Sequence, residues 1–424
     1  MSLGAVLAGV AACSLDVAEP EPEPREGPPA SWSMQGPTGM NTAVMIGRVL
    51  VVRNDEEMFG ADPETGRKLW SFPSAGLRVS GDLIVLLEKH DRIKAFSVAD
   101  PATGRILWRK DSLSGLRVAE DAIFTVTCRK DDECTTTRHD RRSGEPRWNV
   151  RSSDAWLGED GIGARLPFVP ATGSYLPAEL HEDDQGFSVG ARDAKSGRLT
   201  RGRITSGWHE VVVGRTLVSS EHDPPDGDDR CTVTLTAVNV ESGRKKWKRE
   251  VFSGREAHGG CRHWLADAQS GQYSFIGAGS RIAASTEDGY PQVFDLEVGR
   301  TVWRGDVKGV PIDGDGRTLL VRQHADQGSL TLLDFATGRQ LWTAPDPGLE
   351  GSSASWQTAV TGRLVSVSGA VGTRPHVLVY RVEDGQRLGR FPGWLQGLGE
   401  DWAAIGHSPH RPVVGKLQFD FIRF

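Results

Sequence analysis

Short runs of alternating apolar and polar residues recur along the chain, with the same kind of turn between them. Residues 77–87, 92–98 and 211–220 (LRVSGDLIVLL, RIKAFSV and VVVGRTLVSS) show the period of two that is typical of half-buried β-strands. Eight turns with similar sequences follow such strands between residues 62 and 389. The pattern predicts an all-β protein built from antiparallel hairpins.

A glycine with constant neighbours marks each of these turns. Asp or Asn lies four residues before it in seven copies, and tryptophan lies four residues after it in six. The Asp carboxylate can accept hydrogen bonds from the backbone ahead of it. The glycine supplies the positive φ that closes a longer hairpin loop with a bulge. The complete pairs are Gly66 and Trp70, Gly104 and Trp108, Gly144 and Trp148, Gly243 and Trp247, Gly299 and Trp303, and Gly338 and Trp342.

The turns recur every 38 to 56 residues, and two more short strands precede each hairpin. Each unit therefore predicts a four-stranded antiparallel sheet, with strands A to D, the glycine in the C–D turn and the tryptophan on strand D. Four-stranded sheets repeated at this period are the blades of a β-propeller. A tryptophan at one fixed strand position would bury a large flat surface between neighbouring blades.

The two ends of the chain predict how the ring closes. Residues 31–36 (SWSMQG) resemble a lone strand D, and residues 395–401, 402–407 and 413–421 resemble strands A, B and C without a turn after them. A blade built from both termini would leave no exposed sheet edge. Counted strictly, the chain has eight full motifs and one split blade, and seven to nine blades are possible. The count depends most on residues 150–203, which form a long unit without its tryptophan.

The turn pattern Asp-x-x-Thr/Ser-Gly-Lys/Arg-x-x-Trp resembles the signature of the pyrroloquinoline quinone (PQQ)-like propeller repeat family. The resemblance covers roughly residues 31–424, which we expect to form a single propeller. It implies eight blades as the central expectation. The family includes quinoprotein dehydrogenases and non-catalytic envelope lipoproteins, so the repeat implies a fold and not a chemistry.

The N-terminus predicts the compartment. Residues 1–12 form a short apolar run before Cys13, which resembles a bacterial lipoprotein signal with Cys13 as the lipid-modified residue. The run departs from that pattern because no Lys or Arg precedes it, and a disordered apolar stub is the alternative. Residues 13–30 are acidic and proline-rich and would form an extended tether. We expect an extracytoplasmic protein held to the cell membrane by this lipid.

Four further cysteines agree with an oxidising compartment. Cys128 ends strand B of the third blade, and Cys134 begins its strand C. Cys231 begins strand C of the fifth blade, and Cys261 lies in the loop that leads to the sixth. Because B–C and D–A loops share one face of a propeller, we predict the disulfides Cys128–Cys134 and Cys231–Cys261, with buried free thiols as the alternative.

Catalytic and metal-binding patterns are weak. A quinoprotein dehydrogenase would need a calcium-held quinone, a catalytic Asp and usually adjacent cysteines, and no two cysteines are adjacent here. Residues 312–317 (IDGDGR) resemble part of a calcium loop but fall where an A–B turn is expected. His258, Cys261 and His263 could bind zinc only at an unfamiliar spacing. We expect no cofactor, no metal and no catalysis, with a PQQ-dependent dehydrogenase, another propeller enzyme or a ligand-binding sensor as the alternative.

The loops predict a binding face. The C–D turns are short and constant, whereas the B–C and D–A loops vary and contain the insertions 172–186, 221–230 and 253–264. Variable loops on a rigid scaffold are where binding residues concentrate. We predict that the protein, as a monomer, binds an envelope protein or cell-surface ligand there; the net charge of −6 argues against nucleic acid. The candidate partner-binding residues are Glu182, Asp183, Asp184, Asp223, Asp226, Asp228 and Asp229; solvated loops are the alternative.

Overall fold

A computed structural model describes most of the chain after residue 25, and every described element is a strand. The described residues are 26–37, 42–54, 56–73, 75–90, 92–111, 113–128, 134–152, 175–182, 186–205, 209–223, 230–255, 276–323, 328–350, 356–372, 374–407 and 416–424. In this part of the chain no helix could cross a membrane.

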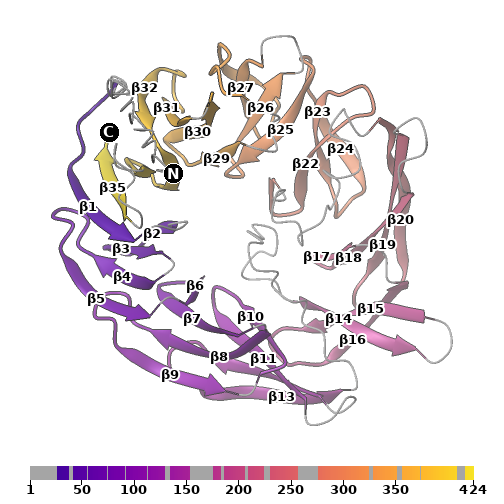
Figure 1. Ribbon diagram of the computed structural model, residues 1–424. Helices are drawn as coiled ribbons and strands as arrows, with labels where there is room; N and C mark the ends of the chain where they lie inside the picture. The colour runs from indigo at the N-terminus through magenta and orange to yellow at the C-terminus, as the bar shows by residue number, and fades with distance from the viewer. Residues whose placement is uncertain are drawn as a thin grey trace, which may run out of the picture.

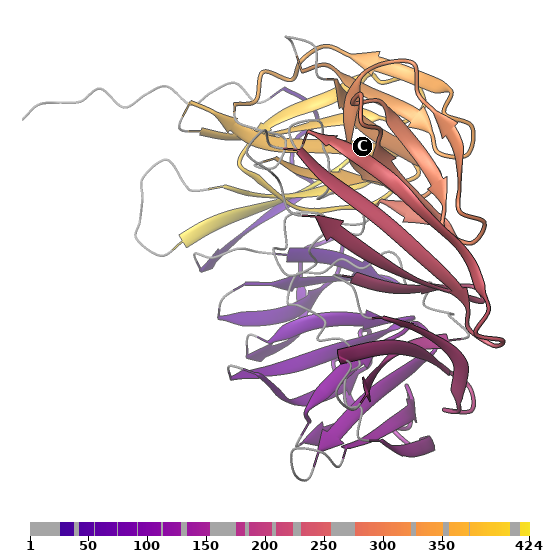
Figure 2. The ribbon, with the colours of Figure 1, turned by 90° about the vertical axis from the view of Figure 1, so that its right-hand side faces the viewer.

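The strands form nine antiparallel sheets arranged around a central axis like the blades of a propeller (Figures 1 and 2). In the four-stranded blades, strand A lies nearest the axis and strand D lies outermost (Figure 1). Blades 1 to 3 contain β2 (Thr42–Ile46), β3 (Val49–Arg53), β4 (Glu57–Ala61) and β5 (Lys68–Pro73); β6 (Gly76–Ser80), β7 (Leu83–His90), β8 (Arg92–Ala99) and β9 (Ile106–Asp111); and β10 (Gly115–Val118), β11 (Ala122–Cys128), β12 (Cys134–Asp140) and β13 (Pro146–Ser152).

The remaining blades follow in chain order. Blades 4 to 6 contain β14 (Tyr175–Glu182), β15 (Gly186–Asp193) and β16 (Leu199–Thr205); β17 (His209–Val213), β18 (Thr216–Asp223), β19 (Arg230–Asn239) and β20 (Lys245–Arg255); and β21 (Gly277–Ala278), β22 (Arg281–Ser285), β23 (Pro291–Asp295) and β24 (Arg300–Arg304). Blades 7 to 9 contain β25 (Gly309–Gly314), β26 (Thr318–Gln323), β27 (Leu330–Asp334) and β28 (Gln340–Ala344); β29 (Gln357–Val360), β30 (Leu364–Val371), β31 (Arg374–Arg381) and β32 (Arg387–Pro392); and β33 (Trp394–Leu398), β34 (Trp402–His407), β35 (Lys416–Arg423) and β1 (Trp32–Pro37).

The predicted β-propeller of antiparallel blades is confirmed, but the central expectation of eight blades is wrong, because the described sheets number nine. Each of the eight glycine turns closes a sheet of its own, and the split blade adds the ninth. Blade 4 has three described strands, β14 to β16, and β15 and β16 flank the turn of Gly197. The loss of its tryptophan therefore did not remove this blade from the ring.

The predicted closure by both ends of the chain is confirmed in blade 9. Strand β1 pairs with β35, with Trp32 opposite Phe421, to give the order β33-β34-β35-β1. The Trp32 ring stacks on Phe421 with 5.1 Å between centroids. On the inner side, β33 lies against β2 so closely that a β-carbon on Gly397 would be 2.2 Å from the Ala43 carbonyl oxygen.

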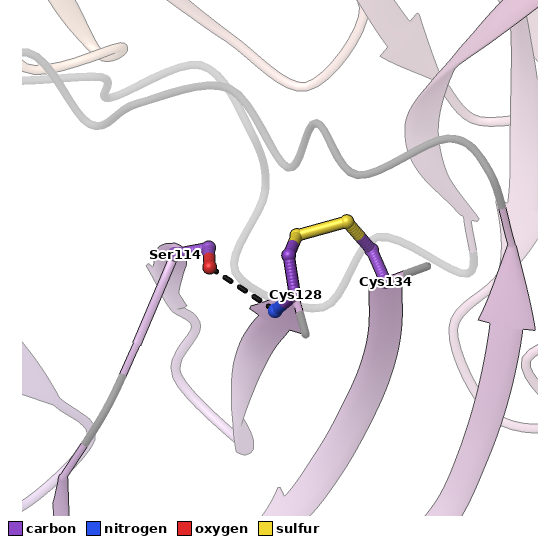
Figure 3. Close-up of a disulfide and its surroundings, with 3 residues drawn as sticks. All are labelled: Ser114, Cys128 and Cys134. Atoms are coloured by element: carbon purple, nitrogen blue, oxygen red, sulfur yellow. Dashed lines mark hydrogen bonds between the residues drawn. A yellow bond between two sulfur atoms is a disulfide. The ribbon is translucent and has the colours of Figure 1, made fainter. Parts of the chain in front are cut away.

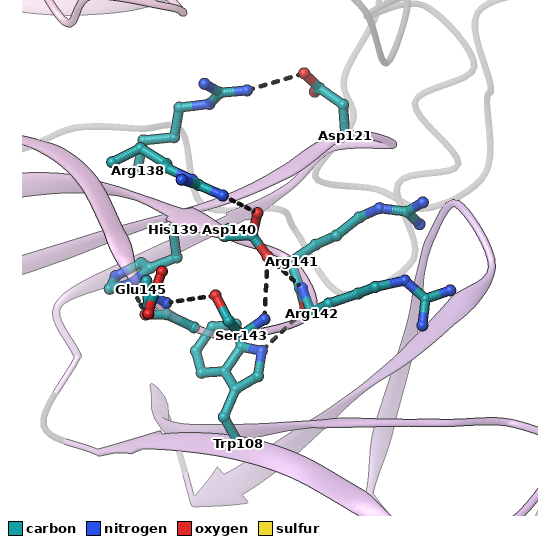
Figure 4. Close-up of polar contacts among 11 residues, drawn as sticks. Trp108, Asp121, Arg138, His139, Asp140, Arg141, Arg142, Ser143 and Glu145 are labelled. Atoms are coloured by element: carbon teal, nitrogen blue, oxygen red, sulfur yellow. Dashed lines mark hydrogen bonds and ion pairs between the residues drawn. The ribbon is translucent and has the colours of Figure 1, made fainter.

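The C–D turns have the predicted hydrogen bonds, as the third turn shows (Figure 4). The Asp140 carboxylate accepts from the backbone N–H groups of Arg142 and Ser143, both at 3.0 Å. The Arg147 guanidinium, 2.6 Å away, and the Ser143 N–H hold the pKa of Asp140 below its usual range. All eight C–D pairs have a register shift beside the turn, which is the expected bulge.

Each tryptophan of strand D covers the turn glycine of the next blade. A β-carbon on Gly104 would lie 2.5 Å from Trp70, and the Trp70 indole N–H donates to the Pro101 carbonyl at 2.7 Å. Six indoles make this bond: Trp32, Trp70, Trp108, Trp148, Trp303 and Trp342. Trp247 covers Gly299 without a hydrogen bond from its indole N–H to any described residue. Beneath these rings, buried apolar side chains join neighbouring sheets.

We call the contact surface between two neighbouring blades a seam. The seam between blades 4 and 5 has no tryptophan, and other groups replace it. The backbone N–H of Gly202 donates to the Val240 carbonyl at 2.8 Å, at the place where an indole N–H donates elsewhere. A β-carbon on Gly202 would lie 2.7 Å from Val240, so the two backbones are in direct contact. The Tyr175 hydroxyl donates to the Glu241 carboxylate across the seam at 2.6 Å.

Removing the Tyr175 hydroxyl should weaken this seam in a pH-dependent way. The hydrogen bond to Glu241, with burial, raises the pKa of Tyr175 from 10.0 to about 12. The protonated phenol therefore contributes stability that is complete below pH 10 and is lost as pH rises through 12. We expect Tyr175→Phe to cost about 1 kcal/mol at pH 7, and to lose less stability than wild type between pH 9 and 11, in urea unfolding.

The control is Tyr290→Phe, because the Tyr290 hydroxyl makes no hydrogen bond to a described residue. It should follow the wild type at each pH. If Tyr175→Phe showed the wild-type pH profile, the bond across the seam would not stabilise the ring.

Candidate functional site

The two faces of the ring differ as the sequence predicted. We call the face with the C–D turns the turn face and the face with the B–C and D–A connections the variable face. Between four and six residues separate strands C and D in each blade that contains such a turn. By contrast, one residue separates β7 from β8 and eight separate β34 from β35. The variable face therefore offers surfaces that differ from blade to blade.

The insertions on the variable face are shorter than predicted, because strands continue into them. Residues 175–182, expected in a loop, form β14, in which Tyr175 and Leu176 are buried. Residues 221–223 extend β18, and residues 253–255 extend β20. Their polar side chains made these stretches look like loops, but they continue the antiparallel pairing.

Two of the candidate partner-binding residues are described, and both end a strand B. Glu182 is the last residue of β14, and Asp223 is the last residue of β18, in the neighbouring blade. Asp223 is exposed and has no side-chain partner among the described residues. The sheets thus place both positions on the variable face. Asp183, Asp184, Asp226, Asp228 and Asp229 lie outside the described residues.

A disulfide joins the strands that border the B–C connection of blade 3 (Figure 3). Cys128 and Cys134 are directly opposite in the pairing of β11 and β12, with Cα atoms 4.0 Å apart, and form the predicted bond. Ser114, which precedes strand A, accepts a hydrogen bond from the Cys128 N–H at 3.1 Å. Cys231 is also disulfide-bonded. Its predicted partner, Cys261, lies outside the described residues, as does Cys13.

Aromatic residues with cationic neighbours on this face were missed by the sequence analysis. In blade 6, Tyr290 has the Arg304 guanidinium 4.4 Å and the Lys308 ammonium 5.5 Å from its ring centroid. In blade 7, the Arg322 guanidinium lies 3.9 Å from the centroid of the buried Trp356 ring. No spacing rule links these residues, but an aromatic beside a B–C or D–A connection was an available signal. The face therefore has cations in blades 6 and 7, of which Arg304 also lies 3.2 Å from the Asp288 carboxylate, and acidic positions in blades 4 and 5.

The described residues contain no group of three or more His, Cys, Asp or Glu that could hold a metal ion. The IDGDGR segment is the A–B turn that the sequence predicted. Its Asp315 carboxylate accepts from the N–H groups of Arg317 and Thr318, at 2.9 and 2.8 Å. His258, Cys261 and His263, the alternative zinc ligands, lie outside the described residues.

Solved structures resemble this chain at low sequence identity and low TM-score. BamB from Moraxella catarrhalis is 14% identical with a TM-score of 0.41, over 82% of this chain and 93% of that one. The designed protein Ika8 is 13% identical with a TM-score of 0.44, over 94% and 100%. A quinohemoprotein alcohol dehydrogenase from Pseudomonas putida HK5 is 10% identical with a TM-score of 0.40, over 92% and 76%. No curated protein matches the chain significantly.

A family model identifies the family of the chain, which these distant structural similarities do not. The model, described as outer membrane protein assembly factor BamB, matches residues 55–305 and 232–416. The two matches overlap and together contain all eight glycine turns of the repeat. The chain therefore belongs to the family of PQQ-like β-propellers that outer membrane protein assembly factor BamB represents.

Proposed function

We propose that this protein is a lipid-anchored, non-catalytic scaffold that engages a protein or other partner of the cell envelope through its variable face. The observation that supports this most is the contrast between the two faces. Constant, hydrogen-bonded turns close one end of blades 1 to 8, and connections of different length leave the other end. Membership of a family described as an outer membrane assembly factor supports a role in assembly.

The ring suits such a role because its blades are already ordered. Connections that leave a rigid sheet lose little further entropy on binding, and preorganisation of this kind favours affinity. The disulfide between Cys128 and Cys134 joins the two strand ends that border one such connection. The acidic positions of blades 4 and 5 favour a partner with a basic surface. Attraction between opposite charges speeds association at low salt.

The anchor in this proposal is Cys13, joined to the ring by the acidic, proline-rich tether. The disulfide-bonded cysteines support an oxidising compartment, because such bonds persist outside the reducing cytoplasm. Labelling with a palmitate analogue, in cells that express the chain from its true start, should mark the wild type and not Cys13→Ser. Equal labelling of both would remove the anchor from the proposal.

Neutralising the acidic positions tests the partner-binding face. We would replace Asp183, Asp184, Asp226, Asp228 and Asp229 together by Asn and compare pull-downs from envelope extract over a range of salt. The expected result is the loss of partners that the wild type retains at low salt, because the Coulombic attraction is gone. The matched control changes the charge equally on the turn face, at the exposed residues Glu64, Glu120, Glu145, Glu383 and Asp384.

The control variant should retain the wild-type partners. If the Asn variant also retained them, with the same dependence on salt, the acidic positions would be solvated surface and the proposed face would be wrong. Robust dye-linked alcohol oxidation with PQQ and calcium would contradict the non-catalytic part of the proposal.

A further inference from the structure

A short N-terminal segment lies against the outer edge of blade 8. Glu26 pairs with Arg390 of β32 as an isolated antiparallel bridge outside the four-stranded sheet. The Glu26 N–H donates to the Arg390 carbonyl at 3.1 Å, and the Arg390 N–H donates to the Glu26 carbonyl at 2.8 Å. The Arg387 guanidinium lies 2.9 Å from the Glu26 carboxylate. The described start of the chain is therefore attached to the outermost strand of this blade.

Glycines on both sides of this contact show how closely the two segments fit. A β-carbon on Gly389 would lie 2.8 Å from the Glu26 carbonyl oxygen and 2.3 Å from the Phe391 ring. A β-carbon on Gly27 would lie 2.9 Å from the Leu388 carbonyl oxygen. The φ of Gly27 is +120°, which other residues rarely adopt. Neither position leaves room for a side chain.

The position of Gly389 also explains why the eighth turn lacks its tryptophan. Gly389 lies four residues after Gly385, where six other turns have the indole. In those blades the indole covers the turn glycine of the next blade. Blade 9 has no such turn, because its strands C and D come from opposite ends of the chain. An indole at position 389 would have no glycine to cover, and the segment Glu26–Gly27 lies there instead.

We infer that Glu26–Gly27 is a clamp that fixes the exit of the N-terminal tether at the outer edge of blade 8. Thirteen residue steps separate Cys13 from Glu26. At full extension they span about 45 Å, so the clamp limits how far the ring can move from its point of attachment. The clamp itself rests only on the contacts above, and its bearing on the membrane rests on the proposed lipid anchor.

The clamp gives the anchored ring a preferred orientation. Blades 4 and 8 lie on opposite sides of the ring (Figure 1). An anchor that leaves from blade 8 holds that edge toward the membrane. Blades 4 and 5, with their acidic positions, are then held away from it. The partner surface of the proposed scaffold would thus be presented to a protein that extends away from the lipid, not to the lipid itself.

Chemical attachment of the full chain to vesicles tests the clamp without lipidation or a partner. The Cys13 thiol would be coupled to a maleimide lipid, and a fluorophore would be placed at Glu383 of blade 8 or at Lys195 of blade 4 through a clickable amino acid. Both are exposed residues of C–D turns, so they differ in blade and not in face. Energy transfer to an acceptor at the membrane surface should be at least twofold higher from Glu383.

The variant Gly27→Val should open the clamp, because it puts a side chain at a disfavoured φ and against the Leu388 carbonyl. The tether would then leave the ring from β1 of blade 9, so the ratio of transfer between the two sites should fall below the wild-type value. The Arg390 amide should exchange hydrogen at least tenfold faster. The amides of β31 should keep their wild-type rates, which reports that the blade is folded. The control is Gly372→Val in blade 8, where φ is +60° and nothing lies within 4 Å of the added carbon.

Two results would overturn the inference. One is equal energy transfer from both sites in the wild type, and the other is an Arg390 exchange rate that Gly27→Val leaves unchanged. A failure of palmitate labelling or of the pull-down would leave both measurements intact, since neither a cellular lipid nor a partner takes part. The experiments can therefore disprove the clamp without disproving the proposed function, and the reverse.

Discussion

Replacing Gly104 by alanine is expected to destabilise the ring by about 2–5 kcal/mol, because two independent costs add. Gly104 has a φ of +69°, and a side chain in this left-handed region costs about 1–2 kcal/mol. The new methyl group would also lie 2.5 Å from Cγ of Trp70, and overpacking of this kind costs about 1–3 kcal/mol more. Chemical unfolding of the variant and the wild type measures the sum.

The control for this experiment is Gly47→Ala in the A–B turn of blade 1. Gly47 has a φ of +61°, but nothing lies within 4 Å of an added β-carbon. It should therefore show only the backbone cost of about 1–2 kcal/mol. The difference between the two variants isolates the contact between the indole and the turn. Equal destabilisation would mean that the Trp70 indole moves aside at no cost. The turn glycine would then be needed only for its positive φ.

Replacing Trp32 by alanine is expected to cost about 3–5 kcal/mol, as for other large aromatic side chains that pack between elements. Its ring stacks on Phe421, covers Gly66 of blade 1, and donates to the Pro63 carbonyl at 3.0 Å. Trp32 thus holds the N-terminal strand both to the C-terminal strand β35 and to the first blade. Its loss should weaken the one seam where the two ends of the chain meet.

Urea unfolding and hydrogen exchange together identify this effect. The amides of β1 and β35 should exchange faster than those of blades 3 to 7, because the ring opens first at its split blade. The control is Trp394→Ala in the same sheet, since Trp394 is 39% exposed. That variant should cost less than Trp32→Ala, because more of the Trp394 side chain is already exposed to water. If both tryptophan variants lost the same stability, the indole of Trp32 would not be what closes the ring.

The sequence predicted those features that depend on neighbours within one hairpin. Asp62 accepts from the N–H groups of Glu64 and Thr65, at 2.8 and 3.1 Å, as a local turn requires. The alternation of apolar and polar residues gave the strands, and the fixed distance from turn glycine to tryptophan placed the indole on strand D. Even the split blade was predictable, because Trp32 and its neighbours repeat a local pattern.

The strand boundaries and the blade count were less predictable, for different reasons. Polar residues in 175–182 favoured a loop, because the sequence cannot show that a neighbouring strand will pair with them. The resemblance to the PQQ-like family favoured eight blades, although eight turns and a split blade allowed nine. Blade 4 is part of the ring without its tryptophan, and the Gly202 N–H donates where an indole N–H donates in other blades.

Some features of the candidate site could likewise be predicted from the sequence, and others could not. The sequence alone identified the variable face and the pairing of Cys128 with Cys134, because both follow from the order of strands in a blade. The cations beside Tyr290 and Trp356, and the bond from Tyr175 to Glu241, required the structure. The residues in that last bond are 66 positions apart, and no short-range rule connects them.

The sequence by itself determined the repeated unit: four strands, a glycine turn and an indole that must cover something in the next blade. Only the tertiary structure decided how many units close the ring and what fills the two seams without an indole. It also brought Glu26 against Arg390, although they lie at opposite ends of the chain. The physical reason is that turns and strand periodicity arise from contacts a few residues apart. Ring closure instead depends on how nine sheets fit together, and that fit is a property of the whole ring.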